Sequence, residues 1–202
     1  MKIKETLFSL SNKQAAGSIT EASDLAFELL SKYCKTERQN NLSVIGFLEG
    51  ESDYTLMLDA HIDQISMVVT DIDDKGFLTV SNAGGIDIRS LPSRRVTVHG
   101  KEKITAVFCS TPPHLANKEE EYENIAQIKI DTLLGEKAKE IISVGDFVTF
   151  SGSAFELSEN LVCGPSFDDR AGVACLIEIA KRLKDKKLPV NVAFVLSDGE
   201  EL

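Results

Sequence analysis

Residues 169–196, DRAGVACLIEIAKRLKDKKLPVNVAFVL, decide the class of the fold. Apolar side chains recur at helical spacing between Asp169 and about Leu183, which predicts a helix there. They are Val173, Leu176, Ile177 and Ala180. Pro189 then opens a strongly apolar run, Val190 to Leu196, which is typical of a buried strand. A helix followed by a buried strand is the building unit of α/β proteins, so we expect an α/β domain at this end of the chain.

A second segment of the same type lies near the other end of the chain. Residues Glu21 to about Cys34 have helical periodicity, and Ser18-Ile19-Thr20-Glu21 in front of them has the pattern of a capping box. Two apolar runs of strand length follow, Leu42–Leu48 and Tyr54–Leu58. Because the second run is nearly continuous, we expect it to be a buried central strand.

The middle of the chain changes to short strands joined by turns. Met67–Ile72 and Phe77–Val80 flank Asp73-Asp74-Lys75-Gly76, a hairpin signal with glycine where positive φ is favoured. Asn117–Asn124 is rich in glutamate and is expected to be a solvated loop. Further strands are expected at Val96–His99, Ile104–Phe108 and Phe147–Phe150.

These patterns divide the chain into two domains. Residues 1–67 and 161–202 are expected to form an α/β domain, and residues 68–160 a small β barrel or sandwich inserted into it. The sequence shows no internal repeat and no low-complexity segment.

Composition excludes several classes of protein. A net charge of -10 argues against binding of nucleic acid, which needs clustered Lys and Arg. No apolar run reaches the length of a membrane span, and residues 1–20 lack the pattern of a signal peptide, so we expect a cytoplasmic protein without a membrane partner. The cysteines show no Cys-x-x-Cys spacing and are expected to be reduced and packed. They are Cys34, Cys109, Cys163 and Cys175.

The first segment that could carry chemistry is Asp59-Ala60-His61-Ile62-Asp63, directly after the second apolar run. Ligands commonly bind at the carboxyl ends of strands in open α/β sheets. A metal-bound imidazole usually donates its other N–H to a carboxylate, and Asp63 is placed to be that carboxylate. Taken alone, a histidine beside an aspartate is more often a surface histidine or a satisfied buried one than a metal ligand.

The second segment is Phe167-Asp168-Asp169-Arg170, at the start of the predicted helix. An aspartate there caps the helix, because it accepts hydrogen bonds from free backbone N–H groups. Capping explains one of the two acids. Two adjacent like charges repel unless a cation lies between them, which leaves a metal-binding role open for the other.

The third segment is Gly199-Glu200-Glu201-Leu202, after the last predicted strand. It is either a solvated acidic loop or a pair of glutamates with different tasks. In the second case one glutamate binds a metal, and the other takes a proton from a metal-bound water. Histidine with carboxylate ligands suits zinc, cobalt or manganese.

The order and context of these segments resemble the dinuclear metallo-aminopeptidases of the glutamyl-aminopeptidase type, whose members often form tetrahedral (TET) assemblies. The resemblance spans most of the chain. Its motifs are Asp59–Ile65, Asn82-Ala83-Gly84-Gly85-Ile86-Asp87, Thr111-Pro112-Pro113-His114-Leu115, Ser166–Gly172 and Gly199–Leu202.

The resemblance implies a role for each matching residue. His61 and Glu201 would each bind one of two divalent metal ions, zinc or cobalt first and manganese as an alternative. Asp168 would bridge the ions, and the peptide bond from Asp168 to Asp169 would be cis. Asp63 would orient His61, and Glu200 would be the general base. Peptides would be the substrates, and the β insert would form dimers that build a dodecamer.

Two departures from the family pattern stand out. Gln64 and Ser66 replace the usual glutamate and glycine, which we expect to alter the surroundings of the site rather than the ligands. The family's two further ligands, an aspartate and a histidine, would follow Leu202. We therefore expect a truncated chain with little peptidase activity of its own. His99 and His114 match no metal position.

Two alternatives to an active aminopeptidase remain open from the sequence. The chain could be an inactive fragment whose β domain is an interaction module, or a related hydrolase of a non-peptide amide. Zinc content distinguishes the first alternative, and cleavage of aminoacyl anilides distinguishes the second.

Overall fold

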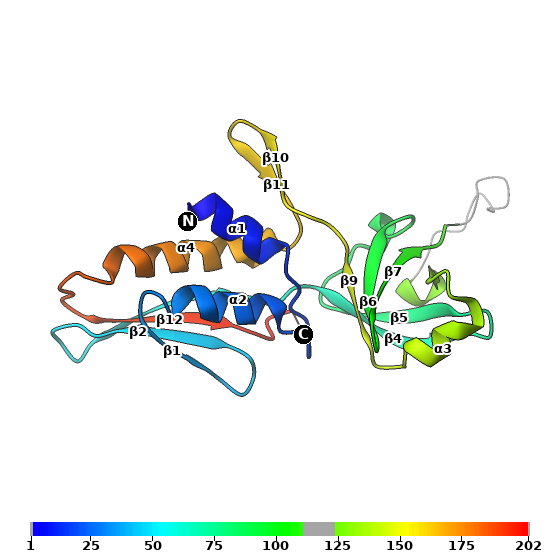
Figure 1. The fold of residues 1–202 in the computed structure, drawn as a ribbon, viewed down its shortest axis with the longest axis horizontal. Helices are drawn as coiled ribbons and strands as arrows, with labels where there is room; N and C mark the ends of the chain where they lie inside the picture. The colour runs from blue at the N-terminus through cyan, green and yellow to red at the C-terminus, as the bar shows by residue number, and fades with distance from the viewer. Residues whose placement is uncertain (1, 111–123, 202) are drawn as a thin grey trace. The chain divides into compact units, whose positions relative to one another are not determined.

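A computed structural model describes residues 2–110 and 124–201 of the chain (Figure 1). They form two compact units, one made of residues 2–64 and 153–201 and the other of residues 65–110 and 124–152. The first is a mixed α/β unit, and the second, inserted into it, is a closed β-barrel. The α/β class with a β insert is therefore confirmed.

The α/β unit is built on a sheet whose strand order is β1-β2-β12-β3. The strands are β1 (Lys35–Arg38), β2 (Val44–Leu48), β3 (Thr55–His61) and β12 (Asn191–Ser197). β12 is antiparallel to β2 and parallel to β3, so that the carboxyl ends of β3 and β12 lie at the same edge of the sheet.

Helices α1 (Ile3–Ser11), α2 (Glu21–Leu30) and α4 (Phe167–Leu183) lie on one side of this sheet (Figure 1). The apolar positions that predicted α4 are all buried, as the helical spacing requires. They pack in a core with Leu10, Leu30 and Phe194, each fully buried. The hydrophobic effect of this core holds the helices on the sheet.

The barrel closes in the order β4-β5-β8-β7-β6-β9 among the described residues. Its strands are β4 (Ser66–Ile72), β5 (Phe77–Ala83), β6 (Arg95–His99), β7 (Lys103–Phe108), β8 (Ile130–Asp131) and β9 (Phe147–Phe150). Short helical segments η1 (Ile88–Ser90), η2 (Ile125–Gln127), η3 (Gly135–Lys137) and α3 (Ala138–Ile141) lie between the strands. Its core is a separate hydrophobic cluster.

The turn between β4 and β5 forms as predicted. Asp73 accepts hydrogen bonds from the backbone N–H groups of Lys75 and Phe77, each at 2.9 Å. Gly76 has φ of +84°, and a Cβ there would lie 2.0 Å from the carbonyl oxygen of Gly135. Only glycine fits this turn.

Several expectations for single elements were wrong. β3 is an edge strand, not a central one, and Tyr54, Leu56 and Met57 in this segment are exposed. Ser18 does not cap α2; the N-cap position is Thr20, and it makes no capping hydrogen bond through its side chain. Cys163 and Cys175 are exposed rather than packed, although all the cysteines are free thiols. The sequence analysis did not predict α1, β1, β8 or α3, most of which are short.

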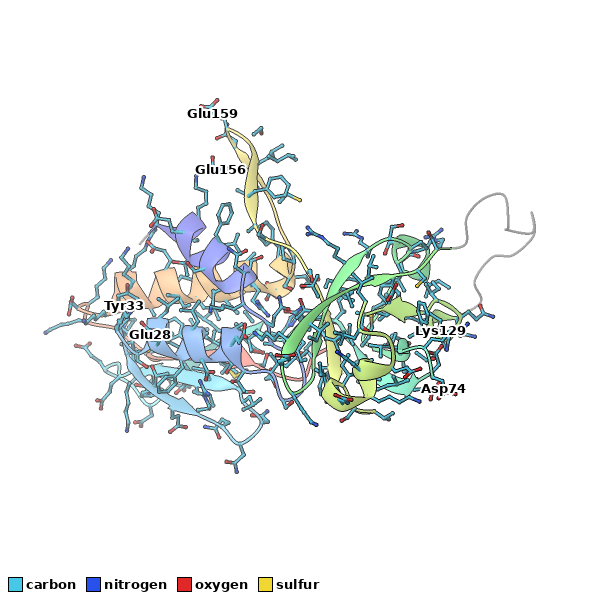
Figure 2. The ribbon with its side chains drawn as sticks, turned by 45° about the vertical axis from the view of Figure 1, so that its right-hand side comes forward. Glu28, Tyr33, Asp74, Lys129, Glu156 and Glu159 are labelled. Carbon is cyan, nitrogen blue, oxygen red and sulfur yellow. The ribbon has the colours of Figure 1, made fainter. Side chains whose placement is uncertain are left out.

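The second border of the insert also differs from the expected position. The hairpin of β10 (Phe155–Ser158) and β11 (Leu161–Cys163) belongs to the α/β unit. It is tied to α1 by an ion pair of 2.6 Å between Lys4 Nζ and Glu156 Oε1, and Figure 2 shows the side chains of Glu156 and Glu159 on this hairpin. The expected insert, residues 68–160, included β10 but not β11.

Two predicted features lie outside the described residues. They are the Thr111–Leu115 motif with His114, and all but the last residue of the Asn117–Asn124 stretch. Within the described part of the chain, no helix combines the length and hydrophobicity needed to span a membrane.

Candidate metal centre

The carboxyl ends of β3 and β12 place His61 beside the acidic segment at the end of the chain. His61 is the last residue of β3 and pairs in register with Ser197, the last residue of β12. The Ile62 N–H donates to the Ser197 carbonyl at 2.7 Å, which keeps the two strand ends together. Gly199, with φ of +93°, then turns the chain toward His61.

The start of α4 divides the two adjacent aspartates between two tasks. Asp168 and Asp169 have non-helical backbone angles, and the peptide bond between them is cis, as the family resemblance implied. Asp169 Oδ1 accepts a hydrogen bond of 2.9 Å from the Gly172 N–H, so Asp169 caps the helix. A Cβ at position 172 would lie 2.5 Å from the Asp169 carboxylate, which explains the glycine. Asp168 is left to face His61.

Four predicted site residues lie together at this edge. His61 Nε2 is 3.2 Å from Asp168 Oδ1 and 3.9 Å from Glu200 Oε2. One ligand atom each from His61, Glu200 and Glu201 lies within 4.8 Å of the others, a grouping that can hold one ion. The side chain of His61 is 11% exposed, that of Glu200 63% and that of Asp168 93%, so the carboxylates face solvent around a half-buried imidazole.

Asp63 lies beneath this group and is almost completely buried. Its Oδ1 accepts from the Glu200 N–H at 3.3 Å, and its Oδ2 accepts from the Glu201 N–H at 3.0 Å. His61 Nδ1 lies 3.4 Å from Asp63 Oδ1, within ion-pair distance. The geometry does not form a hydrogen bond, however, and Nδ1 is a buried atom without a hydrogen-bond partner among the described residues.

The crowded charges shift several pKa values. Burial alone would lower the pKa of His61, but its hydrogen bond with Asp168 and the charges of Asp63 and Glu200 raise it above the usual value. Burial and the charge of Glu200 raise the pKa of Glu201. Burial, together with the charge of Asp63, raises the pKa of Asp198 to about 6. These shifts favour the protonated forms of His61, Glu201 and Asp198.

The donor set fits a divalent cation. A cation would relieve the repulsion among Asp168, Glu200 and Glu201, and imidazole with carboxylates suits zinc, cobalt or manganese. The imidazole presents Nε2 to the carboxylates and keeps Nδ1 near Asp63. This is the usual arrangement of a metal-bound histidine and the carboxylate that orients it.

The structure adds residues for which the sequence indicated no role. Asp198 lies next to the group, and Arg170 is buried behind it. Arg170 belonged to a segment already singled out, whereas Asp198 directly precedes one, and burial distinguishes both residues. His99 lies in the barrel, where its Nε2 is 2.8 Å from Thr149 Oγ1, which agrees with a strand residue outside the metal group.

Comparison with known proteins places this edge in context. The sequence pattern of the M42 glutamyl aminopeptidases matches residues 43–202. A putative aminopeptidase from Acetivibrio thermocellus is 30% identical over 151 residues, covering 73% of this chain and 43% of the relative. The putative aminopeptidase SgcX of Escherichia coli is 27% identical over 209 residues, covering 98% of this chain and 56% of the relative. The chain thus spans about half the length of the curated relatives it matches.

Solved structures agree with the sequence comparisons. The aminopeptidase APDkam598 from Desulfurococcus kamchatkensis superimposes with a TM-score of 0.89 at 28% identity, over 98% of this chain and 56% of that one. The TET1 peptidase of Pyrococcus horikoshii superimposes with a TM-score of 0.86 at 28% identity, over 100% of this chain and 62% of that one. Its structural report describes assembly into a tetrahedron or a large octahedral shell.

Proposed function

Because the chain belongs to the M42 glutamyl aminopeptidase family, we propose that the whole protein removes N-terminal residues from peptides with a water activated between two divalent metal ions. One observation carries the proposal. A half-buried imidazole from the end of one strand faces carboxylates from two distant segments, with a buried aspartate behind it.

The proposed roles are those that the family resemblance implies. Asp168 would be a ligand of both ions, His61 would bind one of them and Glu201 the other. Ions bound there would lower the pKa of a water molecule and polarise the scissile carbonyl. Zinc and cobalt fit these ligands best, and manganese is an alternative.

Glu200 is proposed as the general base. Its carboxylate is largely exposed, so it can reach a water above the site, and its backbone is fixed by the hydrogen bond to Asp63. A carboxylate in this position accepts the proton of the attacking water and returns it to the leaving amine. Asp63, whose Oδ1 lies 3.4 Å from His61 Nδ1, is proposed to orient the imidazole.

The ligands assigned here are few. Among the described residues each ion would have two protein ligands, the shared Asp168 and one further side chain, whereas catalytic zinc usually has three. We therefore expect the 202-residue chain to bind zinc weakly and to hydrolyse peptides slowly.

The barrel is proposed as a dimerisation domain of a cytoplasmic homo-oligomer. The assembly described for the Pyrococcus horikoshii TET1 peptidase supports this proposal. Sedimentation velocity of the purified chain at several concentrations tests it. A monomer at every concentration contradicts it.

The catalytic proposal is tested with three forms of the 202-residue chain: the wild type, His61→Ala and Glu200→Gln. We expect zinc uptake, measured by titration and elemental analysis, to be lost in His61→Ala and kept in Glu200→Gln. With excess zinc, cobalt or manganese, Glu200→Gln should hydrolyse aminoacyl anilides at least about 100-fold more slowly than the wild-type chain. This is the usual loss of rate when a general base is removed.

Each alternative has its own outcome in this test. A wild-type chain that takes up no zinc contradicts the metal centre and favours an inactive interaction module. A chain that binds zinc and hydrolyses N-blocked amides, but not aminoacyl anilides, is a related amide hydrolase instead. Equal turnover of Glu200→Gln and wild type removes Glu200 from the proposed role.

A further inference from the structure

Arg170 is a completely buried cation that lies next to the two aspartates of α4. Its guanidinium donates to the carbonyl of Ile62 from Nε at 2.7 Å. Nη1 donates to the carbonyls of Leu10 at 2.7 Å and Lys13 at 2.8 Å. One side chain of α4 therefore joins the end of α1 to the segment that follows β3.

The acceptors of this guanidinium are all neutral. No carboxylate oxygen of the described residues lies within 4.0 Å of its nitrogens, the distance that defines an ion pair. Burial lowers the pKa of Arg170 to about 10, and the charges of Asp63 and Asp198 oppose that shift, so the side chain is charged at neutral pH. A buried charge without an ion-pair partner is a poor source of stability. Its hydrogen bonds to the end of α1 and to the residues beside Asp63 suggest another use.

Gln64 supplies the remaining contact. Its Oε1 accepts from Arg170 Nη2 at 3.0 Å and from the Ala15 N–H at 3.5 Å. Its Nε2 donates to Gln14 Oε1 at 2.9 Å, and its backbone N–H donates to the Ala15 carbonyl at 3.1 Å. The side chain is 5% exposed, so these contacts are protected from competing water.

Arg170 thereby holds the residues on both sides of Asp63. It binds the carbonyl of Ile62 before Asp63 and the side chain of Gln64 after it. Asp63 in turn accepts from the Glu200 and Glu201 N–H groups and faces His61 Nδ1. A displacement of Asp63 would therefore move both the imidazole of His61 and the backbone of Glu200 and Glu201.

We propose that Arg170 and Gln64 are positioning residues of the metal centre, which fix Asp63 and through it the imidazole of His61 and the backbone of Glu200 and Glu201. This inference rests on the proposed function, because it assumes that these side chains receive a metal ion. Neither residue touches the ion or the substrate. Their effect is on how well the ligands are arranged before the ion arrives.

The first test compares Arg170→Lys with the wild-type 202-residue chain in competition titrations of zinc against a chromophoric chelator. A lysine keeps the charge and can bind a carbonyl, but it lacks the planar fork that reaches Ile62, Leu10 and Gln64 together. We expect zinc affinity to fall about 10-fold, the lower end of losses seen when a group behind a metal ligand is changed.

A matched control separates positioning from stability. Ser23 is buried and donates to the Leu42 carbonyl at 2.7 Å, within the α/β unit but away from Asp63. Ser23→Ala should lower the unfolding temperature and leave zinc affinity unchanged. If Ser23→Ala weakens zinc binding as much as Arg170→Lys does, loss of stability explains both and the inference is overturned.

Two variants of Gln64 test the same inference if Arg170→Lys does not fold. Gln64→Glu keeps both acceptor contacts, and rotation of the Gln14 amide supplies a donor to the new carboxylate, so zinc affinity should stay within about twofold of wild type. Gln64→Leu removes the acceptor for Arg170 and Ala15, and zinc affinity should fall about 10-fold. Equal affinities of the Glu and Leu variants reject the role of Gln64.

A metal-free measurement distinguishes failure of this inference from failure of the proposed function. With a chelator present, the amides of Glu200 and Glu201 should exchange their hydrogens faster in Gln64→Leu than in wild type or Ser23→Ala, because their bonds to Asp63 are loosened. Unchanged exchange rejects the positioning role, whether or not zinc binds. Faster exchange in a chain that binds no zinc keeps the positioning of Asp63 but rejects the metal centre.

Discussion

The α/β unit and the barrel bury different kinds of polar side chain. Among the described residues, the buried polar groups of the barrel are hydroxyls: those of Ser66, Thr132 and Thr149. The α/β unit also buries a carboxylate, an amide and a guanidinium: those of Asp63, Gln64 and Arg170. Burying an ionisable group is costly unless it is well bonded, so a cluster of such groups is a sign of function more than of stability.

The two units also differ in their edges. The barrel is closed, which leaves its strands without free edges, whereas the sheet of the α/β unit ends in the exposed strand β3. That open sheet brings two parallel strand ends together at His61 and Ser197. In the described part of the chain, the group of side chains that can hold a metal lies in the α/β unit. The proposed metal centre therefore lies in the α/β unit, while the proposed role of the barrel is dimerisation.

The largest effect on stability should come from a large-to-small substitution in each hydrophobic core separately. Phe194 in the α/β unit and Phe108 in the barrel are almost completely buried, and their two clusters share no residue. Phe194→Ala and Phe108→Ala should each lower the free energy of unfolding by about 3–5 kcal/mol. Hydrogen exchange should localise each loss to the unit that carries the substitution.

The same pair of variants can break the comparison. Phe108→Ala should leave zinc affinity unchanged at temperatures where both units are folded. If Phe108→Ala opens the amides of β3 and β12 as much as those of the barrel, the two units fold as one. The two units could then not be treated as independent in stability.

The next effect separates the histidines of the two units. His61→Ala removes a proposed ligand, and zinc affinity should fall about 100-fold or more, beyond the loss of about 10-fold caused by weaker changes behind a ligand. His99→Ala, in the barrel, removes the hydrogen bond with Thr149 and should leave zinc affinity unchanged. Chelator competition measures both, and an equal loss in both variants would place the metal elsewhere.

The sequence predicted elements best where periodicity was long. The helical spacing of Val173, Leu176, Ile177 and Ala180 predicted α4, and all four residues are buried. The run Tyr54–Leu58 failed because continuous hydrophobicity does not reveal which strands lie beside it. Its exposed side chains lie at the edge of the sheet, a property of the whole chain rather than of the run.

The residues of the site could be predicted from the sequence, but the contacts between them could not. His61, Asp63, Asp168, Glu200 and Glu201 were identifiable from motifs and family resemblance. The residue pattern alone did not separate Asp169 as a helix cap from Asp168 facing His61, because that depends on the bend at the start of α4, and only the family resemblance pointed to Asp168. The burial of Arg170 could not be predicted either. Several of its hydrogen-bond acceptors are backbone carbonyls, which every residue type has.

A smaller effect concerns the pH dependence of the metal-free chain. The pKa of Asp198 is raised to about 6 from 3.8 by burial and by Asp63. The stability contributed by this group is present in full below its unfolded pKa and is lost as pH rises through the folded value. Asp198 is partly exposed, so we expect solvent screening to limit the loss to about 1 kcal/mol.

Asp198→Asn should remove this dependence. In urea titrations with a chelator present, the variant should be about 1 kcal/mol more stable than wild type near neutral pH and equal to it at about pH 3. The Asp198 N–H keeps its bond of 3.0 Å to Ser43, so the backbone is unaffected. A constant difference between the two chains across this range contradicts a titration of Asp198.

The smallest effect tests a polar group of the barrel. Ser66 is completely buried, and its Oγ has no hydrogen-bond partner among the described residues. An unsatisfied buried hydroxyl costs about 1–3 kcal/mol, and the methyl group left by Ser66→Ala fills nearly the same space. We expect the variant to be as stable as wild type or more stable by up to about 1 kcal/mol.

Thr149→Val is the matched control, because Thr149 is also buried in the barrel but its hydroxyl bonds to His99 at 2.8 Å. This control should lose about 1 kcal/mol in urea denaturation, the typical contribution of a satisfied hydrogen bond. Opposite signs for the two variants would show that the barrel retains its hydroxyls for different reasons. A loss of similar size in Ser66→Ala would mean that its hydroxyl is satisfied in solution, and that Ser66 is part of the barrel's hydrogen bonding.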